Sequence, residues 1–113
     1  MSLLDTDIVI QAIKRMDTSG IISVITVLEF LRGVEDEKRL QAKQLLDQSF
    51  MVLDLDDKVT EVYCKIYRRL KEQRTLLPDA DLIIAATAIA NNLVLETNDG
   101  HFQRLRSFGL KLK

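Results

Sequence analysis

The sequence predicts an α/β fold, namely a three-layer α/β/α domain around a central parallel sheet of four or five strands. Short apolar, β-prone segments alternate along the chain with longer helical segments. Such alternation predicts parallel pairing, because parallel strands need a long crossover, usually a helix. The segment from Leu82 to Ala90 is apolar except at Thr87, which is typical of a central, buried helix whose alanines allow close approach to a sheet.

The first half of the chain is expected to hold three strands and three helices. Gly20 is expected to break the first helix, and Gly33 to serve as the C-cap of the second. A charged segment with a thin apolar stripe gives the third helix. The expected elements are a strand Ser2–Asp5, a helix Asp7–Lys14, a strand Ile21–Ile25, a helix Thr26–Arg32, a helix Asp36–Gln48 and a strand Phe50–Leu55.

The second half begins with the clearest helix, Lys58 to Leu70. Apolar residues recur there at i, i+3, i+4, i+7, i+8 and i+11 from Val59. Pro78, the only proline, is expected to start the next helix, which contains the apolar Leu82–Ala90 stretch. The remaining expected elements are a strand Leu93–Glu96, a short helix His101–Arg106 and an edge strand Leu110–Leu112.

Length and composition limit the class of protein. A chain of 113 residues is expected to form one domain, 1–113. Its net charge of −1 argues against a nucleic-acid binder that depends on a large positive field. No apolar run is long enough to span a bilayer. Cys64 is the only cysteine and the amino terminus lacks the order of a secretory signal, so we expect a cytoplasmic protein.

Four acidic residues lie within or beside apolar segments: Asp5, Glu29, Asp81 and Asp99. Burying an unpaired carboxylate costs several kcal/mol unless a cation or a proton compensates its charge. Asp5 and Asp99 each follow a predicted strand, where ligand sites of parallel sheets lie. Carboxylates without a histidine or cysteine cluster favour a hard divalent cation, Mg²⁺ or Mn²⁺, over zinc.

Each acid also has a purely structural interpretation. Asp5 could cap the helix that follows it, and Glu29 could pair with Arg32 three residues later. Asp81 could favour the positive end of a helix dipole, and Asp99 could be a turn residue. The polar neighbours Thr6, Ser23, Thr26, Thr97 and Asn98 could orient the carboxylates, or could bond only to local backbone.

Four motifs in order carry a family resemblance. They are Leu3-Leu4-Asp5-Thr6-Asp7, then Ser23 to Phe30 with Arg32-Gly33, then Asp81 to Ala88, and Thr97-Asn98-Asp99 with His101-Phe102. Together they resemble the motifs of PIN-domain nucleases, and most of all the small VapC-type toxins. The resemblance implies a metal-dependent endoribonuclease whose metal site is lined by Asp5, Glu29, Asp81 and Asp99. Two departures are a shortened stretch between Asp5 and Glu29, and Asp7 where asparagine is commoner.

The resemblance also implies partners. These are an RNA substrate, a small cognate antitoxin protein that offers an arginine to the carboxylates, and a second copy of the chain. Tyr63, Tyr67 and Phe30 could lie on one shared face of such a homodimer. The rival interpretations are a catalytically silent RNA- or protein-binding module on the same fold, and a phospho-acceptor receiver domain, which would leave Glu29 and Asp81 without a role.

Other charged residues are interpreted structurally. Asp79 is expected to be a helix-start charge, since residues two apart point to different faces of a helix. His101 is expected to be exposed or capping. The basic residues at the end of the Lys58–Leu70 helix are interpreted as complementing the helix dipole, with a grip on RNA phosphate as the alternative; they are Arg68, Arg69, Lys71 and Arg74.

Overall fold

The protein is described by a computed structural model that covers residues 1–113. Five parallel strands form one sheet in the order β3-β2-β1-β4-β5. The strands are β1 (Ser2–Leu4), β2 (Ile21–Ser23), β3 (Met51–Leu53), β4 (Val94–Glu96) and β5 (Lys111–Leu112). The predicted parallel sheet is therefore confirmed, with five strands and with β5 at an edge.

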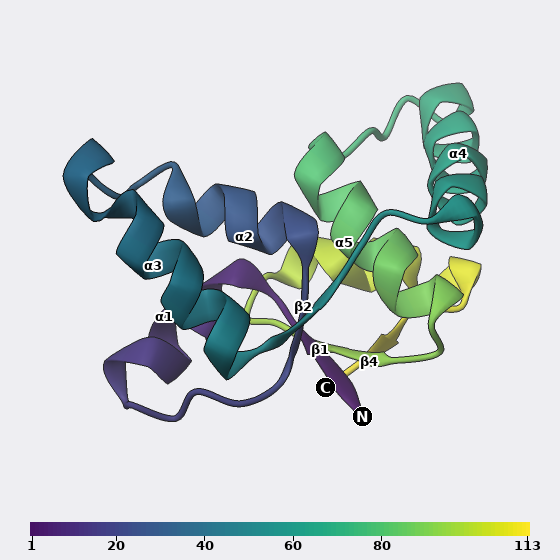
Figure 1. The fold of residues 1–113 in the computed structure, drawn as a ribbon. Helices are drawn as coiled ribbons and strands as arrows, with labels where there is room; N and C mark the ends of the chain where they lie inside the picture. The colour runs from purple at the N-terminus through teal and green to yellow at the C-terminus, as the bar shows by residue number, and fades with distance from the viewer.

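Helices cover both faces of this sheet and give the three layers that the sequence predicted (Figure 1). On one side lie α1 (Thr6–Lys14), α2 (Val24–Leu31) and α3 (Asp36–Ser49). On the other lie α4 (Asp57–Glu72), α5 (Asp79–Ala90) and a 3₁₀ segment, η1 (Gly100–Phe108). No helix is both long enough and apolar enough to cross a bilayer.

The alternation of side chains along each strand divides the core into two clusters. Leu3 and Ile21 face a cluster with α4, α5 and η1, and Leu4 and Ile22 face a cluster with α1, α2 and α3. The α5 residues from Leu82 to Ala88 are buried except Ile83, as predicted for a central helix. Phe30 packs against the second cluster and the two tyrosines of α4 against the first, so their predicted shared face is wrong.

Several boundaries differ from the prediction, and both glycine interpretations are wrong. The first helix ends at Lys14, well before Gly20. Gly20 has φ +141°, and a Cβ there would lie 2.8 Å from a Leu4 side-chain atom, so this glycine is needed for the entry into β2. Helix α2 begins at Val24 because the Ser23 hydroxyl caps the Ile25 N–H at 3.1 Å. It ends with Arg32 as C-cap, and Gly33 has no left-handed conformation.

Candidate metal-binding active site

The candidate site lies where the strand order reverses. From β1 the chain moves outward through β2 to β3, and it returns to the other side of β1 as β4 and then β5. Leu4 of β1 pairs with Glu96 of β4, so the carboxyl ends of these two strands lie side by side. Asp5 and Asp99 follow these ends. In open parallel sheets such a reversal point is where ligands bind.

Asp5 is the most deeply placed of the four acids, with only 7% of its surface exposed. Its Oδ1 accepts the Thr6 N–H at 2.8 Å, and its Oδ2 accepts the Thr97 hydroxyl at 2.7 Å. The predicted helix-capping role is therefore real, but it engages only one oxygen. Burial, together with the smaller effect of the charges of Asp7 and Asp81, raises the pKa of Asp5 to about 6 against the opposing effect of these two hydrogen bonds.

Thr97 joins Asp5 to Asp99. While its hydroxyl donates to Asp5, the same oxygen accepts the Asp99 N–H at 3.0 Å. The Asp99 side chain accepts the His101 N–H at 2.9 Å and lies 3.1 Å from His101 Nδ1. Asp99 thus caps η1, as its turn interpretation expected, and His101 is exposed as predicted.

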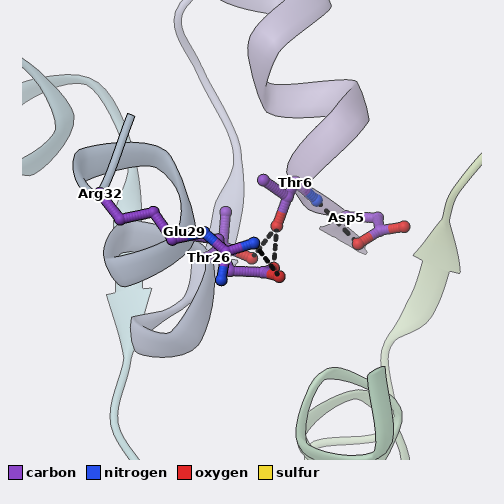
Figure 2. Close-up of polar contacts among 5 residues, drawn as sticks. All are labelled: Asp5, Thr6, Thr26, Glu29 and Arg32. Atoms are coloured by element: carbon purple, nitrogen blue, oxygen red, sulfur yellow. Dashed lines mark hydrogen bonds and ion pairs between the residues drawn. The ribbon is translucent and has the colours of Figure 1, made fainter. Parts of the chain in front are cut away.

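Glu29 reaches the same edge of the sheet from α2. Its Oε1 accepts the Thr6 hydroxyl at 2.7 Å, and the Thr6 oxygen also lies 3.2 Å from the buried Thr26 hydroxyl (Figure 2). Arg32 is 3.8 Å from Glu29 Oε2, but its side chain is 77% exposed. An exposed pair at that distance contributes little, about 1 kcal/mol or less, so Arg32 does not neutralise the site.

Asp81 lies in the first turn of α5 and is half-buried. Burial raises its pKa, the negative charges of Asp99 and Glu29 raise it further, and His101 opposes them. Asp79, two residues earlier, accepts the Tyr63 hydroxyl at 2.7 Å, lines a hollow between α4 and α5, and is exposed. The structure therefore brings Asp81 toward the other acids and leaves Asp79 outside, as expected.

The donor set fits a hard divalent cation. Four carboxylates from four different elements influence one another electrostatically, and the basic groups beside them are the exposed Arg32 and His101. No three acidic, histidine or cysteine side chains lie close enough to bind one ion directly. A cation that keeps several of its own waters suits this spacing, because it needs only one or two direct carboxylates.

Three of the five predicted polar neighbours contact the carboxylates. Thr6 bonds to Glu29, Thr26 lies beside Thr6, and Thr97 bonds to Asp5. Ser23 instead caps α2, and Asn98 is exposed. Sequence reasoning did not find that Thr97 links two acids, although its position two residues before Asp99 on the same strand end was the available signal.

The raised pKa of Asp5 predicts how stability depends on pH without metal. The folded chain holds the Asp5 proton up to about pH 6, whereas the unfolded chain loses it near 3.8. The stabilisation from that proton is present below pH 3.8 and is lost as pH rises to about 6. Asp5→Asn, which cannot ionise, should therefore raise the melting temperature in metal-free buffer at pH 7 more than at pH 4.

Thermal melts of both proteins across this pH range, in the presence of a chelator, check the expectation. The matched control is Asp79→Asn, which removes an exposed carboxylate from the same protein. An Asp5→Asn protein whose stability difference from the parent does not change with pH would contradict the raised pKa.

Comparisons with known proteins agree with this geometry. A PIN domain family model matches residues 3–107. The chain is 41% identical to Ribonuclease VapC1 of Methanocaldococcus jannaschii over 97% of this chain and 85% of that protein.

Solved structures give the same result. A chain of DNA-bound VapBC from Salmonella typhimurium superposes with a TM-score of 0.83 at 26% identity, covering 99% of this chain and 96% of that one. A chain of VapBC-1 from nontypeable Haemophilus influenzae gives 0.82 at 28% identity, with the same coverage. The chain therefore belongs to the PIN domain family and is a VapC-type member of it.

Proposed function

We propose that this protein is a divalent-metal-dependent endoribonuclease that hydrolyses RNA phosphodiester bonds as the toxin of a toxin–antitoxin pair. The observation that carries the proposal is the burial of Asp5 among other carboxylates with no buried base beside it. The relative named Ribonuclease VapC1 supports the choice of RNA as substrate. We further propose that residues 1–113 act as one nuclease domain.

Asp5 and Asp81 would be the innermost ligands of the cation, and Asp99 and Glu29 would reach it through its water ligands. We propose Mg²⁺ or Mn²⁺, because the donors are oxygens and the side chains leave room for water ligands. When bound, such an ion lowers the pKa of a coordinated water and stabilises negative charge on the phosphate.

The chain's own task is to hold the carboxylates in place. Thr97 fixes the orientation of Asp5 and the backbone of Asp99 with a single hydroxyl. Thr6 fixes Glu29 in the same way, and the buried Thr26 supports Thr6. Such supporting groups matter because catalysis depends on ligands already positioned for the transition state. Since all four acids reach the site, a catalytically silent module is the weaker proposal.

Metal binding predicts a thermal response. Mn²⁺ should raise the melting temperature of the parent protein, because a ligand that binds only the native state stabilises it, by about 2.7 kcal/mol at a hundredfold excess over Kd. Asp81→Asn should lose most of this gain. Asp79→Asn, two residues away on the same helix and outside the site, should keep it. Equal responses in both variants would exclude the proposed ligands.

Thr97 offers a finer test within the same titration. Thr97→Val removes the hydroxyl that donates to Asp5 and should weaken Mn²⁺ binding about 10- to 100-fold. Thr97→Ser keeps the hydroxyl and should bind nearly as the parent does. If the valine variant binds Mn²⁺ as tightly as the serine variant, Thr97 does not position the site.

RNA cleavage tests the activity itself. Under saturating Mg²⁺, Asp81→Asn should lower turnover by about 100-fold or more with little change in RNA affinity, since a lost ligand removes stabilisation of the transition state. Asp79→Asn should cleave like the parent. A fully active Asp81→Asn protein would show that the cleavage takes place elsewhere.

We also propose two protein partners, a second copy of this chain and a small antitoxin. A solved relative at 25% identity, a toxin–antitoxin complex from Klebsiella pneumoniae, supports the antitoxin. An arginine from that partner could compensate the carboxylates, because a guanidinium can bind a carboxylate through two hydrogen bonds. A partner bound in this way would compete with the metal.

Sedimentation and partner binding test this assembly together. At micromolar concentration the protein should sediment as a dimer of its 12.9 kDa chain. Addition of the antitoxin should abolish the Mn²⁺ response and RNA cleavage. A species that remains monomeric would exclude the homodimer, and a partner that leaves Mn²⁺ binding intact would exclude inhibition at the carboxylates.

A further inference from the structure

The near-neutral net charge conceals a strong separation of charge along the chain. Residues 65–74 and 100–113 contain nine of the sixteen lysines and arginines and only one of the seventeen acidic residues. The rest of the molecule is therefore strongly acidic. Because the two basic segments are the second half of α4 and the region of η1 and β5, the positive charge belongs to one half of the fold.

Most of these basic side chains have no acidic partner. In α3, by contrast, Lys38, Arg39 and Lys43 each pair with a carboxylate three or four residues away. In the two basic segments only Lys65 and Lys113 form ion pairs, both at 3.8 Å or more. The unpaired and exposed ones are Arg68, Arg69, Lys71, Arg74, Arg104, Arg106 and Lys111.

Contacts between α4 and η1 bring parts of the two segments together. A surface hollow between the two elements is lined by Phe108 of η1 and by Lys65, Arg68, Arg69 and Glu72 of α4, so three basic residues outnumber one acid there. Arg104 of η1 donates to the Thr75 carbonyl just after α4, which ties the two elements. We call the surface formed by these contacts the α4–η1 surface; its basic residues are Lys65, Arg68, Arg69, Lys71 and Arg104.

Aromatic rings lie among these charges. Tyr67 stacks with Tyr63, with ring centroids 6.0 Å apart, and Lys71 Nζ lies 5.9 Å from the centre of the Tyr67 ring. Tyr67 and Phe108 are both partly exposed. Basic groups interleaved with partly exposed aromatic rings are the combination that binds single-stranded nucleic acid, because phosphates meet the charges and bases stack on the rings.

A second hollow connects this basic half with the acidic site. It is lined by Asp99, one of the four acids, together with Arg106 and Lys113. A polyanion whose reactive phosphate lies near Asp99 would thus meet positive charge on the η1 side. The basic residues of α3, on the other face of the sheet, are already paired.

We propose that the α4–η1 surface binds the phosphate backbone of single-stranded RNA outside the scissile bond, and so directs the substrate to the acidic site from the η1 side. The proposal rests on the proposed ribonuclease function and adds where the substrate lies. The surface provides affinity that depends on charge and on salt, whereas the carboxylate site provides the chemistry.

The test compares two triple variants that remove the same charge. One is Arg68→Gln with Arg69→Gln and Lys71→Gln, and the control is Lys38→Gln with Arg39→Gln and Lys43→Gln. Binding of a single-stranded RNA of about 20 nucleotides is measured in a chelator, so that no cleavage occurs, at several salt concentrations. The α4 variant should bind RNA at least about tenfold more weakly than the parent. Its slope of log Kd against log salt should also fall by about 2, because each of the three lost phosphate contacts contributes about 0.7 to that slope. The control should change little in either quantity.

The substitution of lysine for Arg68 and Arg69 separates charge from shape. That variant keeps both charges and should bind RNA close to the parent. Melting temperatures near that of the parent show that the exposed substitutions leave the fold intact. Equal RNA affinity in the two triple variants would overturn the proposal, and so would an α4 variant that binds RNA normally but no longer binds the antitoxin, which would make the surface a protein interface.

Cleavage of short RNA keeps this proposal distinct from the proposed function. A dinucleotide contains only the scissile phosphodiester, so it has no further phosphate for the α4–η1 surface to bind. The α4 variant should cleave it at the parental rate while it cleaves the long RNA more slowly at low substrate concentration. Loss of both activities to the same degree would overturn the inference, and an absence of cleavage by the parent would count against the proposed function alone.

Discussion

Two parallel strands that end side by side impose the central constraint on this molecule. Because β1 and β4 are neighbours where the strand order reverses, Asp5 and Asp99 must leave the sheet at the same edge. The first turn of α5 and the middle of α2 add Asp81 and Glu29 to that edge. The fold thus buries these carboxylates partly and beside one another at some loss of stability, and the raised pKa values of Asp5 and Asp81 express first their burial and then the neighbouring charges.

The hydroxyl groups keep this strained arrangement ordered. Thr97 and Thr6 each donate to one carboxylate, and no buried side-chain oxygen or nitrogen is left without a partner. With every buried polar group satisfied, the remaining imbalance is one of charge. A divalent cation, or a guanidinium inserted by a partner, would neutralise the negative charge of the carboxylates. The proposed metal binding and the proposed inhibition by an antitoxin arginine therefore have the same electrostatic cause.

The layers, the parallel sheet and the converging acids could be predicted because they depend on patterns that are local in sequence. The helical spacing of apolar residues predicts α4, and the continuous apolar run predicts the buried α5. The positions of Asp5 and Asp99 just after predicted strands place them at the carboxyl edge of the sheet. Gly20 and Gly33 were misjudged because their roles depend on contacts with Leu4 and on the backbone of α2, which no local pattern shows. The sequence offered the basic residues of α4 only as a secondary candidate for holding RNA phosphate, because their proximity to η1 depends on the fold.

Proton release on metal binding tests the central claim most directly. If Asp5 is protonated at pH 6 because it is buried among other carboxylates, a bound cation must displace that proton. Calorimetric titration of Mn²⁺ in buffers of different ionisation enthalpy counts the protons released. The parent should release more protons at pH 6 than at pH 8, and at pH 6 Asp5→Asn should release fewer than the parent. Mn²⁺ binding with the same proton release in both proteins would contradict a metal site built on Asp5.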